Sequence, residues 1–114
     1  MKSYTDIEQS KKLAEFLPIE SSDMSWASNG LGKPFARTIP LRGHPEEICG
    51  CWSLAALLDV IPEGLIENYF VPNIQKENGK YSIAYGDEEL LCVADNPVDA
   101  CYEMIIKLYE QKLL

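Results

Sequence analysis

The chain has 114 residues, of which 46% are hydrophobic and 25% are charged, and this is the composition of one ordinary globular domain. Its formal charge is -8, and residues 1–57 hold six basic and seven acidic side chains whereas residues 58–114 hold four and eleven. Because a phosphate backbone or an anionic membrane surface is bound through clustered Lys and Arg, this balance argues against a nucleic-acid or membrane partner.

We expect a cytoplasmic protein. The opening residues 1–12 contain no apolar run of signal-peptide length. The longest uncharged apolar run, from Ile48 to Leu58, is far too short to cross a bilayer, which requires about 20 residues.

The first predicted element is a helix over about residues 6–17. Thr5, followed three residues later by Glu8, fits a capping box, in which the two side chains bond each other's backbone N–H groups. Apolar side chains then recur along one side at helical spacing. Pro18 cannot continue the helix and ends it.

Residues 18–50 show no sustained period, because glycines and prolines interrupt every regular pattern. We therefore expect mostly loop here. The one exception is a possible hairpin, in which residues 24–26 and 35–39 pair across the turn-forming dipeptide Asn29-Gly30.

A second, short helix is expected from Ser53, which can cap it, to Ile61, just before Pro62. Its side chains are nearly all apolar. Isolated helices of this length are marginal in water, so we expect this one to be buried, with Trp52 packed at its start.

Strands follow the second helix. The run from Leu65 to Ile74 is rich in strand-forming residues, and Asn78-Gly79 is the strongest two-residue hairpin signal in the chain. With these two residues in the turn, Glu77 faces Lys80, and the pairs before it are Lys76 with Tyr81, Ile74 with Ile83 and Pro72 with Tyr85.

A third strand is expected after a four-residue turn over 86–89. This turn sets Tyr85 opposite Leu90 and Ile83 opposite Cys92, so these four side chains lie on the same face of the sheet. We place that face under the last helix. Leu91 and Val93 necessarily point the other way.

The last element has the most strongly marked start. Asn96 can cap a helix, and Pro97 suits its first position. The apolar stripe of this helix consists of Val98, Cys101, Tyr102, Ile105, Leu108 and Tyr109. We expect residues 1–114 to form a single α+β domain: N-terminal helix, long loop region, short buried helix, three-stranded antiparallel sheet, and C-terminal helix packed on one sheet face.

The face that carries Leu91 and Val93 is predicted to be an interaction surface, because it leaves a flat apolar patch on the sheet. Residues 18–50 could cover this patch with Trp26 and Phe35. Otherwise an unknown protein partner or a second subunit, in a weak homodimer, would bind there.

Three residues could carry chemistry: His44, Cys49 and Cys51. Tetrahedral zinc takes four ligands, and the remaining cysteines, Cys92 and Cys101, fall on the expected core faces. We expect no cofactor, while the sequence leaves open whether His44, Cys49 and Cys51 bind a metal. A redox pair across one intervening residue would be strained. A nucleophilic pair would have to use His44, the only histidine, with Cys49 or Cys51.

Four segments carry a family resemblance: YTDIEQSKKL, SSDMSW, CWSLAALLDVIP and ADNPVDACYEMIIKLYEQKLL. They are similar to segments of short uncharacterised proteins of gut Bacteroidetes, often encoded in phage-like or mobile regions. The resemblance implies small size, a cytoplasmic location and no catalytic residues. The function expected is therefore that of a non-enzymatic accessory or protein-interaction module of such an element. The alternative is a small metal- or thiol-dependent enzyme that uses His44, Cys49 and Cys51.

Overall fold

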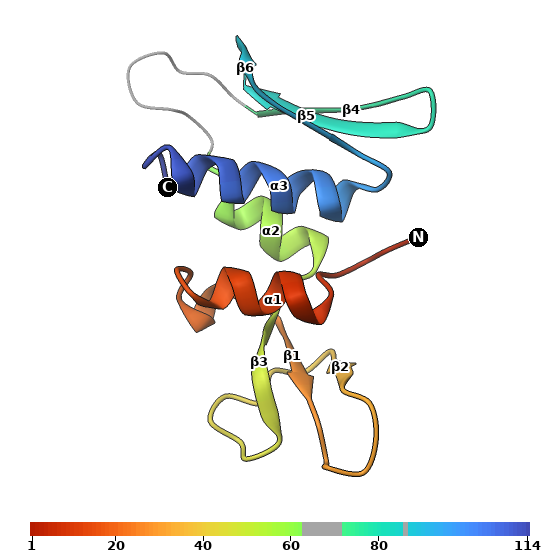
Figure 1. The fold of residues 1–114 in the computed structure, drawn as a ribbon, viewed down its shortest axis with the longest axis vertical. Helices are drawn as coiled ribbons and strands as arrows, with labels where there is room; N and C mark the ends of the chain where they lie inside the picture. The colour runs from red at the N-terminus through yellow and green to blue at the C-terminus, as the bar shows by residue number, and fades with distance from the viewer. Residues whose placement is uncertain (63–71, 86) are drawn as a thin grey trace. The chain divides into compact units, whose positions relative to one another are not determined.

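The computed structural model describes residues 1–62, 72–85 and 87–114 (Figure 1). The elements, in chain order, are α1 (Ile7–Ala14), the short 3-10 helix η1 (Ile19–Ser21), β1 (Met24–Ala27), β2 (Phe35–Arg37), β3 (Glu47–Cys51), α2 (Leu54–Val60), β4 (Pro72–Glu77), β5 (Lys80–Tyr85), β6 (Asp87–Ala94) and α3 (Pro97–Glu110).

The predicted α+β class is confirmed. The chain forms two compact units: an N-terminal unit, Ser3–Ala56, and a C-terminal unit that combines Met1–Lys2 with Leu57–Leu114. That residues 1–114 make one domain stays a prediction. In the described ranges no helix is both long and apolar enough to span a bilayer.

The N-terminal unit contains a three-stranded antiparallel sheet in the order β2-β1-β3. The predicted hairpin of β1 and β2 is confirmed, with Trp26 opposite Ala36. The strand β3 was not predicted. It pairs with the other edge of β1, so that part of the expected loop region is regular structure.

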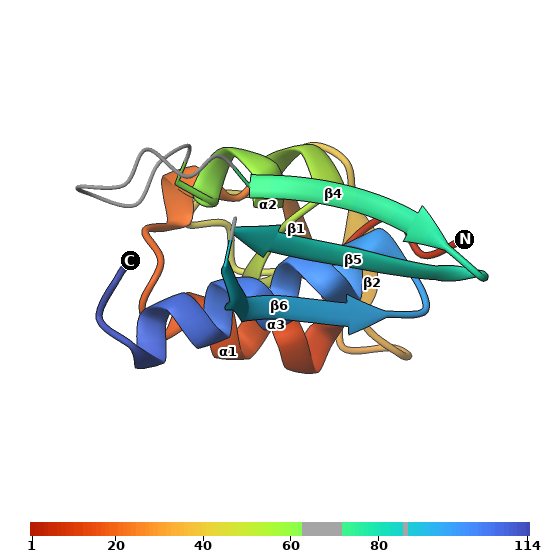
Figure 2. The same ribbon diagram turned by 90° about the horizontal axis from the view of Figure 1, so that it is seen from above.

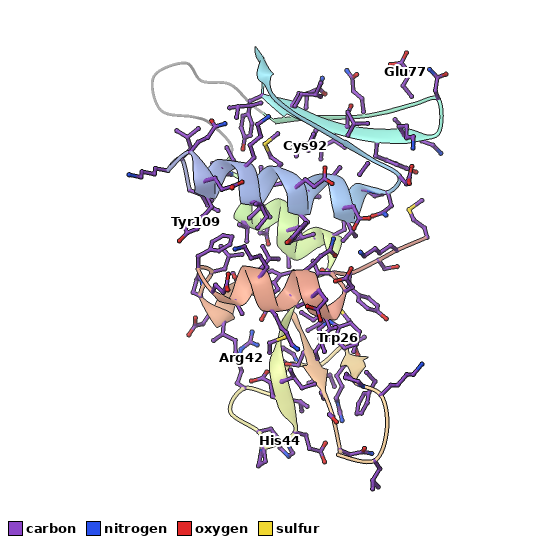
Figure 3. The ribbon with its side chains drawn as sticks, viewed as in Figure 1. Trp26, Arg42, His44, Glu77, Cys92 and Tyr109 are labelled. Atoms are coloured by element: carbon purple, nitrogen blue, oxygen red, sulfur yellow. The ribbon has the colours of Figure 1, made fainter. Side chains whose placement is uncertain are left out.

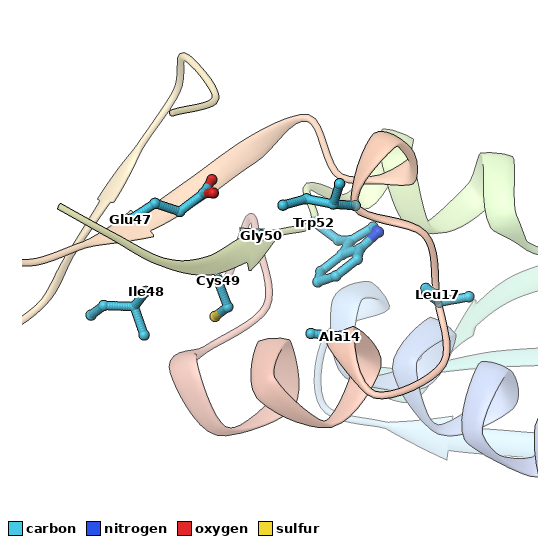
Figure 4. A pocket seen from close by; sticks show the side chains of 8 residues that line it. Ala14, Leu17, Glu47, Ile48, Cys49, Gly50 and Trp52 are labelled. Atoms are coloured by element: carbon cyan, nitrogen blue, oxygen red, sulfur yellow. The ribbon is translucent and has the colours of Figure 1, made fainter. Parts of the chain in front are cut away.

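A bulge explains why β3 has no recognisable sequence pattern. Trp26 faces Cys49, but its neighbour Ala27 faces Glu47, so Ile48 is an extra residue in the strand. Such a bulge breaks the two-residue alternation of side chains. Ile48 and Cys49 therefore both project toward α1, whereas Glu47 projects to the opposite side (Figure 4).

The helix α1 is capped by Asp6, and the prediction that Thr5 and Glu8 form the capping box is wrong. The Asp6 carboxylate accepts the backbone N–H of Gln9 at 2.8 Å, and the Gln9 side chain accepts the N–H of Asp6 at 3.1 Å. The regular helix ends at Ala14, before the expected end at residue 17.

Thr5 is instead fully buried, and its hydrogen bonds connect Trp52, the residue after β3, to the start of α1. Its backbone N–H donates to the carbonyl oxygen of Trp52 at 2.9 Å, and its hydroxyl accepts the Trp52 N–H at 3.1 Å. The same hydroxyl lies 2.7 Å from that of Ser10, and the Thr5 carbonyl oxygen accepts from Trp26 Nε1 at 3.1 Å.

The helix α2 begins as expected. The Ser53 hydroxyl accepts the backbone N–H of Ala56 at 3.2 Å, as an N-cap does, and Trp52 is completely buried just before it. The helix is buried on one side only: Leu57 is 0% exposed, whereas Leu58 is 39% exposed.

The C-terminal unit contains the second sheet, in the order β4-β5-β6. Asn78 and Gly79 both have positive φ angles, 51° and 76°, as the two central residues of a type I′ turn do. This turn fixes the predicted register: Lys76 faces Tyr81, Ile74 faces Ile83, and Pro72 faces Tyr85. The predicted strand residues 65–71 lie outside the described ranges.

The pairing of β5 with β6 is confirmed in part. Ile83 faces Cys92 as predicted, but Tyr85 faces Asp87 and not Leu90. The register shifts between Ala84 and Tyr85, because β6 has more residues there than β5 can pair. Tyr85 is nevertheless fully buried, and its hydroxyl donates to the carbonyl oxygen of Pro62.

The helix α3 packs on one face of this sheet, against β5 and β6 (Figure 2). Asn96 caps it by accepting the Asp99 N–H at 2.8 Å, and Pro97 follows at the first helical position, both as predicted. The predicted apolar face needs a correction, because Met104 is fully buried while Tyr109 is 46% exposed. The helix is thus turned slightly about its axis relative to the prediction.

The C-terminus of α3 ends in a Schellman motif. The Leu113 N–H donates to the Leu108 carbonyl oxygen at 2.8 Å, and the Lys112 N–H donates to that of Tyr109 at 3.0 Å. Lys112 has a φ angle of 60°, a left-handed conformation that glycine usually occupies.

Candidate functional site

The two thiols predicted as candidate ligands lie on β3. Cys49 and Cys51 are two residues apart on the strand and project toward α1. Cys51 is completely buried: its sulfur lies 3.9 Å from the donating hydroxyl of Thr5 and donates to the Thr5 carbonyl oxygen at 3.6 Å. Burial raises the pKa of Cys51 to about 11.

Cys49 is half-buried, and burial raises its pKa too, although the nearby Lys11 charge opposes the shift. Since the thiolate is the nucleophilic form, raised pKa values leave both groups as unreactive thiols at neutral pH. The thiols of Cys49 and Cys51 are therefore packed against α1 and are not activated as nucleophiles.

Gly50, between the two cysteines, is explained by packing. A Cβ atom at this position would lie 2.6 Å from the Ser22 hydroxyl oxygen and 2.9 Å from the Ser22 Cβ. Ser22 directly follows η1 and is itself buried. The glycine thus lets that segment approach the strand, and the Cys-Gly-Cys pattern needs no metal or redox chemistry to explain it.

His44 is exposed in the turn before β3 (Figure 3). Its Nδ1 accepts the backbone N–H of Glu46 at 3.1 Å, and its carbonyl oxygen accepts that of Glu47 at 2.9 Å. Within the described ranges, no three His, Cys, Asp or Glu side chains gather to hold a metal ion. The structure therefore does not bring His44, Cys49 and Cys51 together as a ligand set.

The other two cysteines are core residues, as predicted. Cys92 is 8% exposed and Cys101 is 1% exposed, and Cys92 lies between β6 and α3 (Figure 3). Burial raises the pKa of both, to about 11 for Cys101.

A pocket of about 260 Å³ opens beside β3 (Figure 4). It is lined by Ala14, Leu17, Ile19, Glu47, Ile48, Cys49, Gly50 and Trp52. Glu47 already has partners: its carboxylate accepts from the Ser25 hydroxyl at 2.6 Å and from the Gly43 N–H at 3.3 Å. The lining of the pocket is about as polar as it is apolar. No sequence signal indicated the pocket, because the residues between α1 and η1 read as helix and loop.

The face of the second sheet that points away from α3 is called the outer face here; it carries Ser82, Ala84, Leu91 and Val93. Leu91 is 41% exposed and Val93 is 50% exposed. Trp26, which was expected to cover this face, instead stacks edge-on against Tyr4 at 6.1 Å and bonds to Thr5 within its own unit. That the outer face is an interaction surface stays a prediction.

Comparison of the chain with protein-family models, with curated protein sequences and with solved structures finds no match. The candidate sites are therefore defined by this chain's own geometry: the outer face on the C-terminal unit and the pocket beside β3 on the N-terminal unit.

Proposed function

We propose that this protein is a non-enzymatic accessory module of a phage-like or mobile element, and that it acts by protein binding through the outer face. The observation that carries the proposal is the exposure of Leu91 and Val93 side by side on a sheet face. The family resemblance of the four segments supports the mobile-element context. The buried, protonated thiols and the separate position of His44 support a role without catalysis.

The outer face has the composition of a small interface. Leu91 faces Ala84 and Val93 faces Ser82 across the strands, so the centre is flat and mostly apolar. Lys80 forms an ion pair with Asp95 at one end of the same face. An apolar centre with a polar rim is typical of protein–protein interfaces. Because the rim carries both signs of charge, a second copy of the chain would not be repelled there.

The energy available is modest. Full burial of an aliphatic side chain contributes roughly 1.5–3 kcal/mol, and Leu91 and Val93 have about half of their surface left to bury. The pair would therefore contribute roughly 2–3 kcal/mol per subunit, whereas association costs at least about 4 kcal/mol. Two subunits together barely offset that cost. We therefore propose a weak homodimer as the first contact to test.

Analytical ultracentrifugation tests this contact. Val93→Glu places a charge at the centre of the outer face, and we expect it to abolish the concentration-dependent association of the wild-type protein. Gln111→Glu is the matched control, because Gln111 is exposed at the C-terminal end of α3 and receives the same charge away from the outer face. Far-UV circular dichroism checks that both variants fold. A folded monomer in all three proteins at every concentration would refute the proposal.

A further inference from the structure

The second half of the edge strand β6 has none of the usual protection against pairing with another strand. Prolines, charges and short length are the features that protect sheet edges. On the opposite edge of the same sheet, β4 begins with Pro72 and carries Lys76. Residues 90–94 of β6 read Leu-Leu-Cys-Val-Ala, without a proline or a charge. Of the strands that the structure describes, only β5 pairs with β6, so the other side of β6 is a free edge (Figure 2).

The hairpin between β4 and β5 determines which backbone groups of β6 point to this free edge. In a two-residue turn, the residue after the turn, here Lys80, bonds back to the preceding strand. Successive residues then point their N–H and C=O groups to alternate sides. Ile83 therefore points these groups toward β6, where it faces Cys92. The neighbours of Cys92, which are Leu91 and Val93, point theirs to the free edge.

These two residues are accessible. Leu91 is 41% exposed and Val93 is 50% exposed, whereas Cys92 between them is 8% exposed and lies against α3. No described residue outside the sheet bonds to the backbone of either. The free edge thus offers backbone donors and acceptors together with exposed aliphatic side chains.

A second copy of β6 is complementary to this edge. In an antiparallel pair about a two-fold axis, residues that point outward must face each other. An axis at Cys92 sets Leu91 opposite Val93 of the second copy, and each such pair exchanges two backbone bonds. An axis at Leu91 would set Val93 opposite Glu89. An axis at Val93 would set Leu91 opposite Asp95, so only the axis at Cys92 pairs the aliphatic residues with each other.

Charges on α3 complement one another across the same axis. Glu103 and Lys107 both lie close enough to the Cys92 thiol to influence it, and neither forms an ion pair with a described residue. A two-fold axis perpendicular to the sheet makes the two α3 helices antiparallel, so Glu103 of one copy comes opposite Lys107 of the other. Asp95, just beyond the end of β6, is already paired with Lys80.

We propose that two copies of the chain pair β6 with β6 about a two-fold axis at Cys92, so that their second sheets join into one continuous antiparallel sheet. This inference rests on the proposed function, because it specifies how the homodimer forms. Burial of Leu91 and Val93 by itself barely offsets the cost of association. The backbone bonds between the two strands and the ion pairs between the helices supply the additional stabilisation.

A proline at position 93 tests the strand pairing in analytical ultracentrifugation. Val93→Pro keeps a small apolar side chain but removes an N–H that does not bond to β5, so the fold is retained. We expect association to weaken about tenfold or more, because each pair loses one bond. Ile74→Pro is the matched control: Ile74 is 44% exposed and, since it faces Ile83, points its backbone groups to the outer edge of β4. It should change association less than about twofold.

An exchange of charges tests the register. Glu103→Lys and Lys107→Glu should each weaken association about tenfold, because each puts like charges opposite one another twice in the dimer. The double variant restores both pairs and should associate within about twofold of the wild type. Glu103→Lys also lowers the net negative charge, so a general repulsion between acidic chains would give the opposite result for this variant.

The outcomes separate this inference from the proposed function. Val93→Glu should abolish association in either geometry. If it does so while a folded Val93→Pro protein associates as the wild type does, edge pairing is refuted and the contact through the outer face stands. If Val93→Pro does not fold by circular dichroism, the charge exchange decides, and a double variant no better than the single ones refutes the register. Wild-type monomers at every concentration would refute both proposals.

Discussion

Replacement of Gly50 by Ala should destabilise the N-terminal unit strongly, because the new Cβ would lie 2.6 Å from the Ser22 hydroxyl oxygen and 2.9 Å from its Cβ. Overpacking of this kind costs about 1–3 kcal/mol. Ser22 cannot rotate away freely, since its hydroxyl donates to the Ile19 carbonyl oxygen at 2.6 Å, and loss of that bond adds about 1 kcal/mol. We expect a total loss of about 2–4 kcal/mol.

Urea unfolding followed by tryptophan fluorescence measures this loss. Both tryptophans, Trp26 and Trp52, lie in the N-terminal unit, so the signal reports that unit alone. A unit of this size is expected to have a free energy of unfolding of about 3–8 kcal/mol, so the change would be a large fraction of it.

A second substitution makes the test specific. Ser22→Gly removes both atoms that the new methyl group would meet, and by itself should cost about 1–2 kcal/mol through the lost hydrogen bond and added backbone freedom. In the double variant the clash is absent, so Gly50→Ala should then cost less than about 0.5 kcal/mol. Additive effects of the two substitutions, or a Gly50→Ala protein as stable as the wild type, would refute the packing explanation of Gly50.

Four further predictions follow from the fold. Lys112→Gly should raise the free energy of unfolding by about 0.5–1 kcal/mol, because Lys112 has a φ angle of 60°, whereas Lys112→Ala should give no gain; thermal unfolding by circular dichroism compares them. Iodoacetamide should modify the half-buried Cys49 first and Cys101, which is 1% exposed, only on unfolding, as peptide mass spectrometry can show; early modification of Cys101 would contradict the α3 packing. The free energy of unfolding should fall as the pH rises from about 9 to 11, because the Cys51 and Cys101 thiols ionise near pH 9.0 in the unfolded chain and only near pH 11 in the folded chain. The stabilisation is complete below pH 9.0 and is lost as the pH approaches 11. Urea unfolding of a Cys101→Ala variant should show a smaller fall over the same pH range. Duplex DNA should not bind at physiological salt, given the charge of -8; a salt-sensitive shift in fluorescence anisotropy would reveal a basic surface that we have missed.

Local chemistry made the β4–β5 hairpin predictable. A two-residue turn that needs two positive φ angles suits Asn78 and Gly79, and it fixes every later pair in the ladder. The exposed positions of Leu91 and Val93 follow from that register, so this candidate surface could be located from the sequence. The pairing failed first at Tyr85, where β6 inserts extra residues, because a bulge leaves no mark in a sequence read by alternation alone.

Features that depend on tertiary contacts could not be predicted. β3 pairs with β1 although the paired residues, from Ala27 with Glu47 to Met24 with Cys51, are 20 to 27 positions apart in the chain, and its bulge at Ile48 removes the alternation that would identify a strand. Thr5 and Asp6 are both favoured caps by residue type, with Asp ranked somewhat above Thr, and the bonds of Thr5 to Trp52 leave the cap to Asp6. The pocket needs the α1–η1 segment beside β3, a placement that no local pattern contains.

The network around Thr5 restricts which sequences can adopt this fold. A valine at this position would match the shape of threonine, yet it would leave the Trp52 N–H and the Ser10 hydroxyl buried with a lost partner. Serine would keep the hydroxyl and lose only a methyl group. Among close relatives of this chain, position 5 should therefore vary between threonine and serine while the surrounding apolar positions exchange freely. A buried polar network of this kind favours one arrangement of the helix and strand over similar alternatives, because only residues that keep its hydrogen bonds are tolerated at position 5.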